Sequence, residues 1–186
     1  MPRADVEPSS YNVHPVSESI EQILAHELGK LGAAGVGPAL EMASAIADAV
    51  GAASIPGTAE AAMRRGALRG AEFAARRMPN NVFQAEVHLP LAASTALGIF
   101  AGALQDVGRS LTGDPGRPNP TVRGVVMAGA RNMNPAVVEV EVVVLGASES
   151  GVILTGTAKE GLIKQRAGEK AVRAVLAAAG AAEPNP

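Results

Sequence analysis

One segment, residues 38–54, restricts the fold more than any other because as a helix it would be apolar around most of its circumference. Its polar residues Glu41, Ser44 and Asp48 recur at spacings of three and four, so they form one narrow stripe. Most of the other positions are apolar or small. A helix with this pattern has to be buried on several sides. The neighbouring sequence offers little to bury it, so the segment predicts contact with another chain or with lipid.

The composition also favours association between chains. Hydrophobic residues make up 47% of the 186 residues, but aromatic residues make up only 2%, and there are 21 glycines and no tryptophan. Small side chains let backbones approach closely, but each of them buries little area. A core built from such residues is weak unless chains share elements, and we therefore expect an oligomer.

Charge and cysteine content exclude several classes of function. The formal net charge is -2, which gives no overall electrostatic reason to bind nucleic acid. The chain has no cysteine, which excludes thiol catalysis, disulfide bonds, thiolate metal sites and cysteine-held iron–sulfur clusters. Residues 1–16 carry acidic residues and prolines where a signal peptide needs an apolar run. We expect them to form the disordered tail of a cytoplasmic protein.

The sequence before the first predicted strand indicates three helices, at residues 19–31, 38–54 and 58–78. Ser19 and Gln22 have the spacing of a capping box at the start of the first helix. A glycine-rich run ends that helix, and Pro38 suits the first turn of the second. We interpret residues 17–78 as a helical oligomerisation region associated with a membrane.

The third predicted helix carries two notable sets of residues. Small residues recur at every fourth position and form a small-residue seam suited to close helix contact: Ala62, Gly66, Gly70 and Ala74. Five arginines lie beside this seam: Arg64, Arg65, Arg69, Arg76 and Arg77. They could attract anionic lipid or a partner. Alternatively, they form a solvated face that Glu60 and Glu72 partly neutralise.

The pattern changes near Pro79, where we expect a domain boundary. Residues 81–180 predict an antiparallel-rich α+β domain of order β-α-β-β-β-α that binds a partner, and residues 181–186 a second disordered tail. The predicted strands are residues 82–89, 121–131, 136–145 and 151–159, and the predicted helices are residues 90–111 and 164–179. Glu139 and Glu141 alternate with valines, which indicates a sheet with one wet and one dry side.

Nothing in the sequence forms a recognisable catalytic or metal site. His14, His26 and His88 lie in different predicted elements, and no two of them have ligand spacing. The glycines of residues 32–37 do not follow a strand and lack the lysine of a phosphate-binding loop. Cations near residue 160 could receive an anionic group, although a solvated helix start is the simpler interpretation: Lys159, Lys164 and Arg166. We therefore expect no catalytic residue, no metal ligand and no enzymatic activity.

The organisation as a whole resembles a known family. An apolar helical part rich in alanine and glycine, a boundary near Pro79, a small α+β part and the absence of redox ligands are similar to the membrane-associated linker subunit of the actinobacterial high-affinity uptake nickel–iron hydrogenase.

This resemblance implies a homotetrameric scaffold on the inner face of the cell membrane. Its C-terminal domains would bind the large and small hydrogenase subunits. Its N-terminal helices would form a tube that binds no cofactor directly but encloses menaquinone or lipid. The residues expected to face that lipid or quinone are Leu40, Met42, Ile46, Val50 and Ile55.

A second interpretation comes from a different class of protein. Residues 81–180 could form a small helix-grip fold that resembles the START-like superfamily, in which case the chain would carry a lipid or another ligand. The four predicted strands are fewer than that fold normally has, which puts its cavity in doubt.

Overall fold

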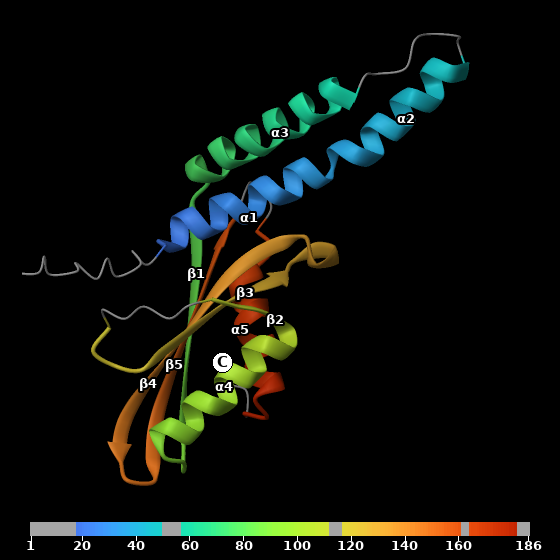
Figure 1. Ribbon diagram of the computed structural model, residues 1–186. Coiled ribbons are helices and arrows are strands. Elements are labelled where there is room, and N and C mark those ends of the chain that lie inside the picture. The colour runs from blue at the N-terminus through green and yellow to red at the C-terminus, as the bar shows by residue number, and fades with distance from the viewer. Residues whose placement is uncertain (1–17, 50–56, 112–116, 161–163, 182–186) are drawn as a thin grey trace, which may run out of the picture.

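The computed structural model describes residues 18–49, 57–111, 117–160 and 164–181 (Figure 1). The expected tails, residues 1–16 and 181–186, lie outside this part of the chain except for Ala181. The helices are α1 (Ile20–Ala34), α2 (Val36–Ala49), α3 (Gly57–Arg77), α4 (Ala93–Val107), the short 3-10 helix η1 (Ala130–Asn132) and α5 (Ala167–Ala178). The strands are β1 (Asn80–Leu89), β2 (Gly108–Leu111), β3 (Thr121–Ala128), β4 (Asn134–Gly146) and β5 (Glu149–Lys159).

The strands form one antiparallel sheet in the order β1-β5-β4-β3-β2. The predicted α+β class is therefore confirmed, and each of the four predicted strands is present. The first strand lies at one edge and pairs with the last strand, β5. Consecutive strands from β2 to β5 pair with their neighbours in sequence, so the chain crosses the sheet once, through α4.

The predicted helix over residues 90–111 is wrong at both ends. The helix α4 begins at Ala93 and ends at Val107, and the next four residues form the edge strand β2. Gly108 lies so close to β3 that a Cβ atom there would clash with the carbonyl oxygen of Val125. The absence of a side chain thus allows the chain to leave the helix and pair directly with the sheet.

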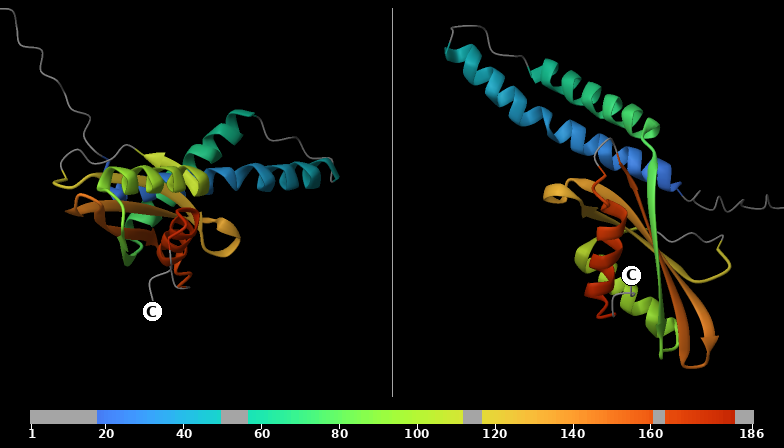
Figure 2. Two further views of the ribbon diagram at one scale, coloured as in Figure 1. Left: turned by 90° about the horizontal axis from the view of Figure 1, so that it is seen from below. Right: turned by 180° about the vertical axis from the view of Figure 1, so that it is seen from behind.

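One face of the sheet carries the main hydrophobic core. The helices α4 and α5 pack on this face (Figures 1 and 2). The valines of β4 that point toward them, Val138, Val140 and Val142, are fully buried. Gly156 of β5 and Gly168 of α5 lie in such close contact that a Cβ atom at either residue would overlap the other residue's backbone. These two glycines let α5 lie directly on the strand.

The first turns of α1 cover part of the opposite face. Ile23 and Leu24 are buried against Val125 of β3 and Val137 of β4. The expectation of a wet side is therefore wrong where α1 covers the sheet, because Glu139 on this face is only 7% exposed. It is buried together with cationic partners, as described below.

The helices α1 and α2 run along nearly the same line and extend beyond the sheet, with α3 lying antiparallel beside them (Figures 1 and 2). The glycine-rich run produces only a brief interruption, because Gly35 keeps helical backbone angles, φ -68° and ψ -16°. Pro38 falls in the first turn of α2, as predicted. The chain passes from α3 into β1 through Met78 and Pro79, so the two elements follow each other almost without a loop.

Candidate functional site

The contact between α1 and α3 depends on glycines of α1. A Cβ atom built on Gly29 would lie 2.7 Å from Cγ of Glu72, and one built on Gly32 would lie 2.7 Å from Cβ of Ala71. The two helices therefore approach closely because these positions lack side chains. Small residues were predicted to mediate helix contact, but on α3 and not at these two glycines of α1.

The predicted small-residue seam of α3 faces away from α1. Ala62, Gly66, Gly70 and Ala74 are all exposed, and no atom lies within 4 Å of a Cβ built on either glycine. The two glycines of the seam thus face no other described element of this chain, and a role of the seam in contact with a second chain stays a prediction. Phe73, adjacent to the seam in sequence, is 55% exposed.

The predicted lipid-facing positions lie in and after α2, which continues past the start of α3 (Figures 1 and 2). Leu40 is half-buried, whereas Met42 is 68% exposed. The side chain of Ile46 and the whole of Val50 and Ile55 lie outside the described part of the chain. Among the described residues of α2, Met42 thus presents apolar surface that no other described element covers.

The five arginines of α3 have different environments. Arg64 pairs with Glu60 at 2.7 Å, and the guanidinium of Arg77 lies over the ring of Phe73, 3.9 Å from its centroid. Arg65 and Arg69 are exposed, and no described carboxylate lies within ion-pair distance of either. Arg76 is also exposed and lines the groove described next. Arg65 and Arg69 therefore remain available to an anionic group or a partner outside that groove.

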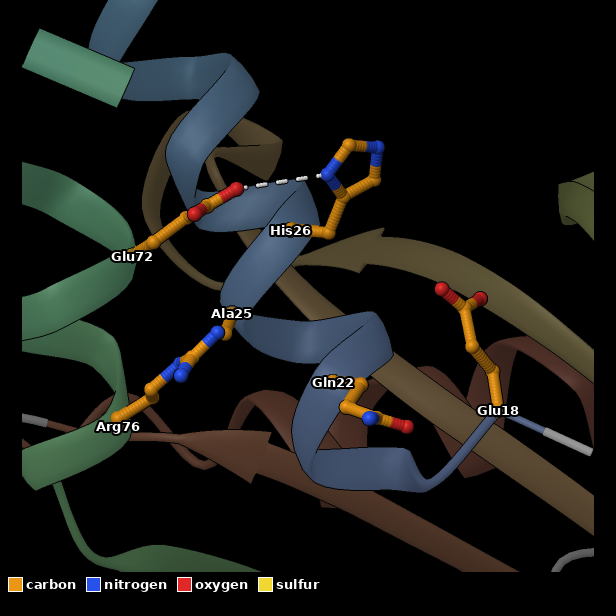
Figure 3. A pocket seen from close by; sticks show the side chains of 6 residues that line it. All are labelled: Glu18, Gln22, Ala25, His26, Glu72 and Arg76. Atoms are coloured by element: carbon orange, nitrogen blue, oxygen red, sulfur yellow. Dashed lines mark ion pairs between the residues drawn. The ribbon is translucent and has the colours of Figure 1, made fainter. Parts of the chain in front are cut away.

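A polar groove of about 200 Å³ lies between α1 and α3 (Figure 3). Its lining residues are Glu18, Gln22, Ala25, His26, Glu72 and Arg76. His26 Nδ1 lies 3.5 Å from Oε1 of Glu72, and the imidazole points outward from α1. The groove therefore mixes basic and acidic groups but brings no hydroxyl or thiol nucleophile next to the imidazole.

The three histidines do not meet. His26 lies on α1, His88 is exposed on β1, and His14 falls outside the described residues. In the part of the chain that the structure describes, no group of three histidine or carboxylate side chains could hold a metal ion. Within the same ranges, no helix is both long enough and apolar enough to span a membrane.

A buried lysine joins the sheet to α1. The Lys159 side chain is only 2% exposed, and its ammonium lies 2.6 Å from Oε2 of Glu21. It also donates a hydrogen bond to the carbonyl oxygen of Met78, and Asn80 donates one to the Glu21 carboxylate. The hydrogen bond from Lys159 is the main reason that the pKa of Glu21 lies below its ordinary value. Both sequence interpretations are therefore wrong for Lys159, since it is part neither of a solvated helix start nor of an exposed site for an anionic group.

A second buried ion pair lies beside the start of α1. Arg123 Nε is 3.1 Å from Oε2 of Glu139, and Arg117 pairs with the other carboxylate oxygen at 2.6 Å. Arg123 also donates a hydrogen bond to the backbone oxygen of Glu18. This arrangement was not predicted from the sequence, because its members come from four separate places: the segment before α1, the segment before β3, and the strands β3 and β4.

Together these observations define an α+β protein with a charged contact between α1 and the sheet and an exposed, small-residue helical surface. No family model and no curated protein sequence matches the chain. Solved structures that align with part of this chain include the Zhui aromatase/cyclase from a Streptomyces strain, at 16% sequence identity, over 55% of this chain and 87% of that one, with a TM-score of 0.29. They also include a point mutant of norcoclaurine synthase from Thalictrum flavum, bound to a transition-state analogue, at 12% identity over 55% and 92% of the chains, also with a TM-score of 0.29. Similarity at this level carries no inference about what this chain binds.

Proposed function

We propose that this chain is a non-catalytic scaffold that oligomerises through α2 and α3. The observation that carries the proposal is the exposed apolar surface of these helices: Met42 is 68%, Met63 50% and Phe73 55% exposed. Completely burying a side chain of this size stabilises an assembly by about 1.5–3 kcal/mol. Gly66 and Gly70 lie on the same helix as Met63 and Phe73 and would allow the backbone of a second helix to approach closely.

The buried charged groups between α1 and the sheet also support a role without catalysis. Arg123 pairs with Glu139 and Lys159 pairs with Glu21, and these ion pairs hold α1 on the sheet. Because the chain has no cysteine, it would depend on partner subunits for thiolate-held redox centres.

The resemblance in organisation suggests a more specific role within the same proposal. The chain would be the linker subunit that tethers hydrogenase large and small subunits to the inner face of the cell membrane. Four copies of α2 would enclose an apolar path for menaquinone, with Leu40 and Met42 among the residues that face it. Arg65 and Arg69 would lie near anionic headgroups or an acidic partner surface.

Native mass spectrometry of the full chain tests the scaffold. We expect a tetramer for the unmodified chain and loss of the tetramer in the double variant Met42→Glu/Phe73→Glu, because carboxylates would be buried in the helix contact. Met133→Glu is the matched control, since Met133 is 62% exposed but lies just before β4. A monomeric unmodified chain, or a tetramer that survives the double substitution, would contradict oligomerisation through these helices.

The hydrogenase role requires a separate measurement. Purification of the native complex from the source organism should yield the chain together with metalloenzyme subunits and extractable menaquinone. A tetramer that copurifies with neither would leave the scaffold in place and overturn the hydrogenase assignment.

The carrier remains the alternative, and the position of α5 across one face of an antiparallel sheet is the observation that favours it. A carrier of this type would hold its ligand between the sheet and the helices. In this chain the side chains of Phe100, Leu104 and Leu154 are fully buried in that space. Binding of a fluorescent fatty acid by a monomer, abolished by Ala96→Trp in α4, would favour the carrier over the scaffold.

A further inference from the structure

The edge strand β1 has features that favour pairing with another strand. It is ten residues long and pairs with β5 on one side, and no described strand pairs with its other side. Its register with β5 is uninterrupted from Asn80 to Leu89, without a bulge. Pro79 and Pro90 flank the strand, but no proline lies within it.

Proteins normally protect an edge strand with short length, bulges, prolines or charged side chains. The opposite edge of this sheet follows that rule, because β2 has only four residues. In β1 the only carboxylate is Glu86, no lysine or arginine is present, and Val82 is 60% exposed. Since no described strand pairs with the backbone groups along the free side of β1, a partner strand could pair with them.

We propose that β1 pairs antiparallel with β1 of a second copy of this chain, about a twofold axis at Ala85. In this register Gln84 lies opposite Glu86, so the amide can donate a hydrogen bond to the carboxylate. Val82 lies opposite His88 on the same face, and Phe83 lies opposite Val87 on the other face. Each pair occurs twice, as the symmetry of a homodimer requires.

The two neighbouring registers are less favourable. An axis at Glu86 would place two carboxylates directly opposite each other, which destabilises a strand pair. An axis at Gln84 would place Val82 against the Glu86 carboxylate. Charge and side-chain type therefore select the axis at Ala85, and the self-complementary pattern favours a second copy over an unrelated peptide.

This pairing would join two five-stranded sheets into one continuous sheet. It involves a different element from the α2–α3 surface, so it does not depend on the proposed scaffold. If both contacts form, they join chains in two directions and give an assembly larger than a dimer.

Disulfide trapping in the full chain tests the register directly, because the natural sequence has no cysteine. Residues directly opposite in antiparallel strands have Cα atoms about 4.5–5.5 Å apart, which a disulfide spans. Diagonal neighbours are about 7–8 Å apart, which is too far. We expect a Gln84→Cys chain and a larger, tagged Glu86→Cys chain to form a mixed disulfide when coexpressed and oxidised, and either variant alone to form none.

A paired set of substitutions tests whether that disulfide depends on the edge. Val82→Lys places a cation on the edge strand opposite His88 and should abolish the mixed disulfide. Val144→Lys is the matched control, because Val144 is 65% exposed on the interior strand β4, and it should leave the disulfide intact. Absence of a mixed disulfide, a self-disulfide of Gln84→Cys, or a mixed disulfide that survives Val82→Lys would overturn the proposal. These outcomes report on β1 alone, so they are distinguishable from loss of the helix-mediated tetramer.

Discussion

The ammonium of Lys159 on β5 lies 2.6 Å from the carboxylate of Glu21 in the first turn of α1, and this ion pair fastens the helix to the sheet. The two partners differ in exposure, since the lysine side chain is 2% and the glutamate side chain 50% exposed. Loss of the ion pair would therefore destabilise the buried ammonium more than the half-exposed carboxylate. Without this carboxylate, the buried ammonium would retain its hydrogen bond to the Met78 carbonyl oxygen.

The first prediction concerns the loss of that carboxylate. We expect Glu21→Gln to lower the free energy of unfolding by about 1–2 kcal/mol at pH 7. This is less than the cost of breaking a fully buried ion pair, because solvent screens the half-exposed Glu21. Urea denaturation of the two proteins measures the difference. Glu149→Gln serves as the control, because Glu149 is exposed and pairs with no described cation, and it should leave the midpoint unchanged. Equal effects of both substitutions would show that the ion pair does not stabilise the fold.

The second prediction is the pH dependence of the same contact. The pKa of Glu21 is lowered in the folded chain, so its contribution to stability is fully present above its ordinary pKa of 4.5. That contribution is lost as the pH falls below this value and through the folded pKa. The stability difference between the natural chain and Glu21→Gln should therefore stay constant from pH 7 to about pH 5.5 and shrink at lower pH. A difference that grows on acidification would contradict the assignment.

The third prediction compares the two arginines that pair with Glu139. Arg123 has a 6% exposed side chain, whereas that of Arg117 is 42% exposed. Arg123→Met should cost about 2–4 kcal/mol, because it leaves a buried carboxylate with one cation fewer and removes the hydrogen bond to Glu18. Arg117→Met should cost about 1 kcal/mol or less. Urea denaturation distinguishes the two, and a double-mutant cycle with Glu139→Gln should return a coupling energy for Arg123 larger than for Arg117.

Much of the fold could be predicted from sequence because it follows local rules. The capping box at Ser19 is present with both of its hydrogen bonds, and the alternating valines of β4 correctly predicted its buried side. The strand β2 could not be predicted, because Leu111 continues the helical period of Leu104 and Val107. In the structure Leu111 instead packs with the cluster under α1, on the other face of the sheet.

The charged contacts between α1 and the sheet were not predictable for a different reason. Glu21 and Lys159 are far apart in sequence, and each alone is typical of a solvated surface. Only the register of β5 and the position of α1 bring them together. The sequence did contain one signal, since Lys159 falls on the same face of β5 as Thr157, a position that alternation places opposite the core. A covering helix on that face was needed to turn this signal into a prediction of burial.

The last prediction uses two glycines in the paired helices α1 and α3. Substituting alanine for an exposed helical glycine normally stabilises a protein by about 0.5–1 kcal/mol. Gly70→Ala should show this gain in the isolated chain, because nothing lies within 4 Å of the added methyl group. Gly32→Ala should instead lower stability by about 1 kcal/mol, because its methyl group would lie 2.7 Å from Cβ of Ala71 and would push α1 away from α3.

Urea denaturation at low protein concentration tests this contrast between monomers, and native mass spectrometry extends it to the assembly. If the small-residue seam contacts a second chain, Gly70→Ala should weaken the oligomer while it stabilises the monomer, since the added methyl group fills the space that another helix would occupy. Gly32→Ala faces α3 of its own chain, so it should weaken both. An oligomer unaffected by Gly70→Ala would exclude close packing at that position and confine the contact between chains to Met42, Met63 and Phe73.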